Sequence, residues 1–231
     1  MDLLTRLDPF SLPDALALGG LVLVWLGIGW VIEHPPAWRL SVSVLMAEYQ
    51  RDWLRQFVTR NPRIYDATVL DTLRQGTAFF ASACMITLGG GIALLGNVDR
   101  LAGLAGDFSL PTASVVLEIK VIVVLALLAN ALLKFIWAHR LFGYCAVLMS
   151  AVPNDPDHPE CHPRAAQAAE ISITAVRGFN RGLRSIYFAL AALCWLLGAV
   201  PLVVGTVLAG ATLARREFAS QSRQAILLGR A

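Results

Sequence analysis

The sequence predicts an all-α membrane protein with four transmembrane helices and long cytoplasmic helical extensions. Of its 231 residues, 57% are hydrophobic and only 15% are charged, which is more apolar side chain than a soluble core of this size holds. A bilayer core about 30 Å thick requires about 20 helical residues, because a helix rises about 1.5 Å per residue. Four stretches reach or approach that length, so we expect a single integral membrane domain over residues 1–231.

The predicted spans are residues 14–33, 76–97, 113–138 and 186–213. The first begins with a helix-start pattern, in which Ser11 can cap free amide groups and Pro13 lacks a donor that the first turn does not need. Its acidic flank and the missing cleavage motif favour a retained helix over a signal peptide. We also expect Pro201, together with Gly198 and Gly205, to kink the fourth span.

Helices are also predicted outside the four spans, over residues 38–60, 62–75, 139–150 and 163–185. The first is amphipathic, since its apolar residues recur at helical spacing and its charged residues fall mostly on the opposite face. The third continues the third span without a helix breaker other than Gly143. A single helix about 60 Å long is therefore expected there.

Charge distribution sets the expected orientation, because loops rich in Lys and Arg stay in the cytoplasm. Loop 34–74 holds six arginines and loop 140–184 holds five, whereas the loop between them holds only Arg100. We expect a bacterial cytoplasmic (inner) membrane protein with both of these loops cytoplasmic and both termini outside. The arginines of the C-terminal tail conflict with that placement: Arg215, Arg216, Arg223 and Arg230.

Two apolar segments carry a resemblance to a known family. They are TAFFASACMITLGGGIALL at residues 77–95 and RGFNRGLRSIYFALAALCW at residues 177–195, with the long third span between them. Together they resemble an uncharacterised family of multi-span bacterial membrane proteins, the domain of unknown function 599, over most of residues 15–210. The resemblance implies an integral membrane protein and supplies no catalytic residues.

The third span carries polar residues inside its apolar run: Glu118, Lys120, Asn130 and Lys134. Lys120 and Lys134 lie on nearly the same helical face, so they can serve as anchors whose ammonium groups reach opposite headgroup layers. Alternatively, Lys120 and Asn130 face a bundle interior or a pore. An uncharged amide cannot reach the headgroups, so we expect Asn130 to bond to a neighbouring helix.

A basic stripe precedes the fourth span, where Arg177, Arg181 and Arg184 share one helical face with Asn180 beside them. We expect the stripe to contact anionic lipid headgroups, with an acidic partner or a phosphate-bearing ligand as the alternative. In the second span we expect Gly89, Gly90 and Gly91 to allow close helix packing, since small residues let two backbones approach.

No motif for catalysis, a phosphate loop or a structural metal site is recognisable, so we expect no enzyme activity and no cofactor. The cluster from Asp157 to His162 fits a solvated turn better than a metal site, and an axial haem pair of His34 and His139 is a minor alternative. The expected function is a non-catalytic accessory, scaffold or assembly subunit. Its expected partners are the bilayer, anionic lipids and further membrane chains, including copies of itself, and not nucleic acid. The alternative is a small oligomeric channel or carrier that uses Lys120, Asn130 and Glu118.

Overall fold

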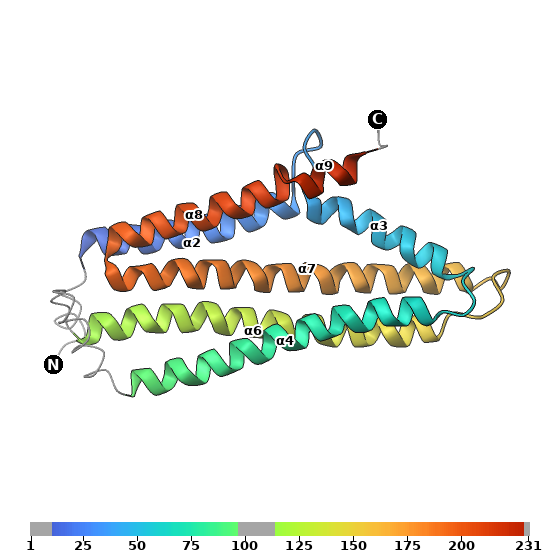
Figure 1. Ribbon diagram of the computed structural model, residues 1–231, viewed down its shortest axis with the longest axis horizontal. Coiled ribbons are helices and arrows are strands. Elements are labelled where there is room, and N and C mark those ends of the chain that lie inside the picture. The colour runs from blue at the N-terminus through green and yellow to red at the C-terminus, as the bar shows by residue number, and fades with distance from the viewer. Residues whose placement is uncertain (1–10, 97–113, 229–231) are drawn as a thin grey trace. The chain divides into compact units, whose positions relative to one another are not determined.

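The computed structural model describes residues 11–96 and 114–228, and within these ranges the chain is all-helical. The helices are α2 (Leu12–Glu33), α3 (Val42–Phe57), α4 (Ile64–Leu95), α6 (Ser114–Ser150), α7 (Cys161–Leu193), the 3₁₀ helix η1 (Cys194–Leu197), α8 (Ala199–Phe218) and α9 (Gln221–Leu227) (Figure 1). Four segments are long and apolar enough to cross a membrane: Leu12–Glu33, Ile64–Leu95, Val115–Ser150 and Ala199–Leu227. The predicted fold class is confirmed. The predicted loop residue Arg100 and the tail residue Arg230 lie outside the described residues.

Two of the predicted spans are continuous with the predicted helices beside them. The expected helix at 62–75 and the span at 76–97 form the single helix α4, while the third span and the helix at 139–150 form α6, which has 37 residues. The amphipathic helix predicted at 38–60 is the shorter α3. Its start is fixed by Ser41, whose hydroxyl accepts the Val44 amide, as expected of a capping serine.

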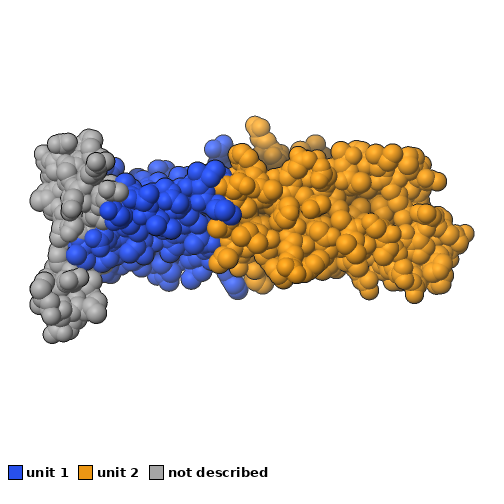
Figure 2. All heavy atoms as spheres, turned by 90° about the horizontal axis from the view of Figure 1, so that it is seen from below, with its two compact units in different colours: residues 1–31, 83–131, 183–215 blue, residues 32–82, 132–182, 216–231 orange. Residues whose placement is uncertain are grey.

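The described chain divides into two compact units, which are coloured separately in Figure 2. Unit 1 comprises residues 1–31, 83–131 and 183–215, and unit 2 comprises residues 32–82, 132–182 and 216–231. Because each unit takes three separate pieces of the chain, neither corresponds to a contiguous stretch of sequence. The single membrane domain over residues 1–231 stays a prediction.

Unit 1 is built from parts of α2, α4, α6 and α7 together with η1 and α8. Its core includes Leu21, Leu127, Phe188, Trp195 and Leu202, all buried. In α8, a Cβ added at Gly210 would lie 3.0 Å from Val24 of α2, so these two helices pack closely. Small residues thus bring the backbones of unit 1 together, as the weak hydrophobic force within lipid requires.

The fourth predicted span is wrong as a single kinked helix. Helix α7 ends at Leu193, η1 follows, and Gly198 adopts a φ of 122° before α8 begins at Ala199. A Cβ at Gly205 would lie 3.2 Å from the carbonyl oxygen of Ala191, so α8 runs back along α7 as a hairpin. Gly198 supplies the left-handed backbone that ends a helix, and Pro201 falls in the first turn of α8, where proline costs no hydrogen bond.

Unit 2 has its own core, centred on Phe57, Leu70, Phe142, Met149 and several small residues of α7. The small residues allow α7 to approach α6 closely: a Cβ at Gly178 would lie 3.6 Å from the Cβ of Ala138, and one at Gly182 would lie 2.7 Å from the ring of Phe135. Phe80, Phe135 and Phe179 add a cluster of ring contacts with centroids 5.4–5.6 Å apart.

The C-terminal segment of unit 2 is clamped to α3. Glu217 accepts the amide and the hydroxyl of Ser43, both at 3.0 Å, so its carboxylate caps the first turn of α3. Arg223 donates to the carbonyl of Leu40 at 3.0 Å, and α9 packs against α3. These contacts join the C-terminal segment to loop 34–74, whereas the sequence predicts that the two lie on opposite sides of the membrane. The side on which the C-terminus lies stays a prediction.

We predict that Glu217→Ala destabilises unit 2 by about 1 kcal/mol, since the first turn of α3 loses a charged capping group. The free energy of unfolding in detergent measures the loss, and hydrogen exchange at Ser43 and Val44 localises it. Arg216→Ala removes an exposed neighbouring charge and is the matched control. Equal stability and exchange in the two variants would contradict the clamp.

Candidate functional site

The polar residues of the third span lie on α6 and fall in both units. Lys120 is buried in unit 1, where its Nζ lies 5.7 Å from the centroid of the Trp195 ring. The indole N–H of Trp195 donates to Asp14 Oδ1 at 2.7 Å. One buried aromatic ring therefore contacts a cation through its face and a carboxylate through its edge, and it joins α2, α6 and η1.

Asn130 also lies in unit 1, ten residues after Lys120 on α6. The hydroxyl of Ser185 on α7 donates to Asn130 Oδ1 at 3.1 Å, and Ser185 is buried. The expectation that Asn130 bonds to a neighbouring helix is confirmed. This bond links α6 to α7, and the Lys120–Trp195 contact links α6 to η1.

Glu118 and Lys134 are half-buried. Within residues 11–96 and 114–228, no side-chain hydrogen bond or ion pair joins either of them to another group. Lys120 and Lys134 share a helical face, but their side chains have different surroundings. The ammonium of Lys120 contacts an aromatic ring within unit 1. Lys134, in unit 2, is half-buried, and its role as an anchor at a membrane boundary stays a prediction.

The predicted basic stripe does not present three equivalent arginines. Arg181 donates from Nε to Glu33 Oε1 at 2.8 Å and pairs with the other carboxylate oxygen as well, which raises the pKa of its guanidinium above the usual value. Arg184 is buried in unit 1, and its Nε would lie 3.6 Å from a Cβ at Gly29. Arg177 is exposed, and Asn180 is half-buried. Of the stripe, Arg177 is the residue placed to meet a headgroup without first leaving an ion pair or a buried position.

The three consecutive glycines of α4 have different surroundings. A Cβ at Gly91 would collide with the side chain of Leu125 on α6, whereas a Cβ at Gly89 or Gly90 would meet nothing within 4 Å. Close packing within the chain therefore uses Gly91 alone. Three adjacent positions on a helix point in three directions, so they could not all face α6. Gly89 and Gly90 are exposed, and their expected part in close helix packing stays a prediction.

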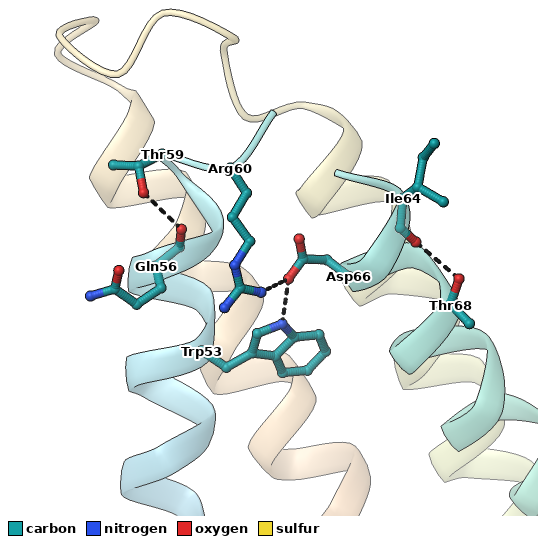
Figure 3. Close-up of polar contacts among 7 residues, drawn as sticks. All are labelled: Trp53, Gln56, Thr59, Arg60, Ile64, Asp66 and Thr68. Carbon is teal, nitrogen blue, oxygen red and sulfur yellow. Dashed lines mark hydrogen bonds and ion pairs between the residues drawn. The ribbon is translucent and has the colours of Figure 1, made fainter. Parts of the chain in front are cut away.

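Sequence reasoning missed a buried polar cluster in unit 2, at the start of α4. Asp66 is fully buried, and its Oδ1 accepts the Trp53 indole N–H at 2.6 Å and pairs with Arg60 (Figure 3). Asp66 Oδ2 is buried without a hydrogen-bond partner among the described residues. In the sequence, Asp66 looks like an acidic residue at a helix start, and nothing in the pattern shows that Trp53 of α3 turns toward it.

His139, one of the two histidines considered as a haem pair, contacts α4 within unit 2. His139 Nδ1 lies 3.1 Å from Thr77 Oγ1 and 3.4 Å from the carbonyl oxygen of Arg74, contacts that join α6 to α4. In the described part of the chain, no three His, Cys, Asp or Glu side chains gather as a metal site. In the turn before α7, the Glu160 amide donates to His158 Nδ1 at 3.2 Å, which fits a solvated turn.

We predict that Asn130 and Ser185 are energetically coupled, because their bond joins two helices where lipid offers no replacement partner. A double-mutant cycle of Asn130→Leu and Ser185→Ala should give a coupling of about 0.6 kcal/mol in the free energy of unfolding. Ser82→Ala, at an exposed position of α4, is the control and should add independently to Asn130→Leu. A coupling no larger than that of the control pair would contradict the bond.

A family model described as "Protein of unknown function, DUF599" matches residues 16–222 of the chain. No curated protein and no solved structure matches the chain.

Proposed function

The chain belongs to the DUF599 family, and from its geometry we propose that it is a non-catalytic subunit of the bacterial cytoplasmic membrane that assembles with further membrane helices. The observation that carries this proposal is an open glycine pair on the lipid-facing side of α4. Gly89 and Gly90 have no atom of the described chain within 4 Å of an added Cβ. A helix of another chain can therefore approach the α4 backbone there.

The exposure of α4 supports this role. Only 6% of its apolar segment is buried within the chain, compared with 39% for that of α6. Ile86 and Ile92 are exposed on either side of the glycine pair, at 77% and 63%. Lipid tails can cover apolar side chains, but a glycine pair flanked by large residues also forms a notch into which a partner helix fits. We propose a second copy of the chain as the simplest partner.

The use of polar groups also supports assembly over transport. Lys120 and Asn130 contact Trp195 and Ser185 of the same chain, and Glu118 is half-buried. A channel or carrier would need these groups to line a water-filled path. We therefore rank that alternative second, and it requires a rearrangement that frees Lys120 from the Trp195 ring.

We further propose that the end of α7, which is not one of the four candidate spans, also crosses the membrane. The chain would then cross five times, by α2, α4, α6, the end of α7 and α8. Residues 185–214 are uncharged, and the hairpin at Gly198 folds this stretch into two antiparallel segments. An odd number of crossings puts the C-terminus on the side opposite the N-terminus, with the arginine-rich loops 34–74 and 140–184. Arg215, Arg216 and Arg223 then join the other arginines in the cytoplasm, and the charge conflict in the sequence disappears.

The proposed topology places the C-terminus in the cytoplasm. Green fluorescent protein fused to the C-terminus should therefore fluoresce, and alkaline phosphatase fused there should be inactive. A phosphatase fused after residue 97 is the control and should be active, because the loop between α4 and α6 is proposed to lie outside. An active phosphatase at the C-terminus would contradict the five crossings.

The assembly predicts opposite outcomes for two adjacent glycines. Gly90→Leu should weaken oligomer formation in mild detergent or nanodiscs and leave the thermal midpoint of the monomer nearly unchanged, since its side chain enters the notch. Gly91→Leu should lower the thermal midpoint, because the new side chain collides with Leu125 of α6. Native mass spectrometry measures the oligomer. A wild-type chain that is monomeric and brings no membrane partner, or a Gly90→Leu variant that assembles normally, would overturn the proposal.

A further inference from the structure

Unit 2 contains an open groove of about 480 Å³ that no role described above uses. Its volume lies within the range of small-molecule sites. The groove lies between the first turns of α4 and the end of α6, with Phe57 of α3 at its margin. One side of the groove is formed by position 63, directly before α4, and by positions 67, 70 and 74 of α4, and their spacing of four, three and four residues fits one helical face. Asp66 lies off this face and is bound to α3, so the groove and the Asp66 cluster are separate features.

The walls of the groove combine apolar side chains with arginines. Phe57, Leu70 and Met149 are buried residues of the unit 2 core, and each presents part of its surface to the groove. Arg63 and Arg74 lie about 16 Å apart along α4, at the two ends of the α4 face. Such a surface suits a molecule that has an apolar body and one charged end.

The two arginines are bonded in different ways. Arg63 donates to the carbonyl oxygens of Val152 at 2.9 Å and Pro153 at 2.8 Å, and its guanidinium lies 4.5 Å from the centroid of the Phe57 ring. These contacts hold the turn after α6 in place, which gives Arg63 a structural role. Arg74 has no carboxylate partner in the described part of the chain, and its Nε is buried without an acceptor. Arg74 lines the groove, and its guanidinium has no acceptor among the described residues, so a ligand acceptor that bonds to the part of the guanidinium that faces the groove would be stabilising.

The charge around Arg74 limits the ligand further. Asp71 lies three residues earlier on α4, also lines the groove, and accepts a hydrogen bond from Gln75 at 2.7 Å. This carboxylate leaves room for one negative charge beside Arg74 but disfavours a multiply charged group such as a nucleoside triphosphate. A planar guanidinium matches a carboxylate by two parallel hydrogen bonds.

We propose that this groove binds a small amphipathic monocarboxylate, with its carboxylate on Arg74 and its apolar body along Leu70, Met149 and Phe57. Arg74 is the residue that recognises the charge, and the apolar walls select the body. The proposal is independent of the assembly through α4, since the glycine pair lies in unit 1 and the groove lies in unit 2.

The test uses the full chain in nanodiscs and hexanoate as the probe, observed by saturation-transfer NMR with empty nanodiscs as the reference. Hexanoate should bind and should raise the thermal midpoint of the wild type. Hexanol has the same apolar body without the charge, and inorganic phosphate has charge without the body, so both should bind much more weakly. Hexanol or phosphate binding as well as hexanoate would overturn the assignment, as would the absence of hexanoate binding at millimolar concentration.

Three variants show whether hexanoate binds in the groove or is only attracted by the positive charge of unit 2. Arg74→Gln should weaken hexanoate binding about 10- to 100-fold, the loss expected for one charge-assisted hydrogen bond. Arg55→Gln removes an exposed arginine of unit 2 outside the groove and should bind as the wild type does. Ala67→Phe fills the groove from an exposed position and should abolish binding without altering any charge. A correctly folded Arg74→Gln or Ala67→Phe variant with wild-type affinity would overturn the proposal.

Discussion

Close approach of other helices to α6 is the constraint on which the remaining structure depends. In unit 1, Gly91 of α4 leaves space for Leu125, and in unit 2, Gly178 and Gly182 of α7 leave space for Ala138 and Phe135. Where lipid surrounds the chain, burying an apolar side chain against another helix gains little, so van der Waals contact at short range must hold the helices together. Glycine and alanine at the contact positions allow the helices to come close enough for this contact.

Polar bonds add specificity to this packing. The Trp195 ring joins Asp14 and Lys120, and the Asn130–Ser185 bond fixes α6 against α7. Such bonds tolerate little sliding, because a helix shifted by one residue would leave a polar group without its partner. In unit 2, Asp66 also fixes the position of neighbouring segments, because it bonds to Trp53 and Arg60 at the junction between α3 and α4. Asp14, Lys120 and Asp66 thus act as structural links. We propose that other molecules bind at the open notch on α4 and in the groove beside Arg74.

The hairpin at Gly198 connects the fold to the charge pattern. As one long span, residues 186–213 would carry the C-terminal arginines away from the other basic loops. As two segments joined at Gly198, they return the chain to α3, where Glu217 caps the helix and Arg223 binds Leu40. In the proposed topology, the contact between α3 and α9 and the arginine count are then consistent with one side of the membrane. A local backbone choice at one glycine decides the position of the whole C-terminal segment.

The sequence by itself determined the helical fold class, the membrane class and the continuity of α6, because these depend on composition and on the absence of helix breakers along the chain. It also indicated that Asn130 would bond to another helix, since a buried amide needs a partner. The identity of that partner, the choice of Gly91 over Gly90 as the packing position, and the encounter of Asp66 with Trp53 were decided by the tertiary structure. Each depends on how a helix is rotated about its axis and which helix lies beside it, and both are set by packing among residues distant in sequence. The break at Gly198 belongs to the same group. A glycine with a proline three residues later in an apolar run permits either a kink or a reversal, and contact between α7 and α8 selects the reversal.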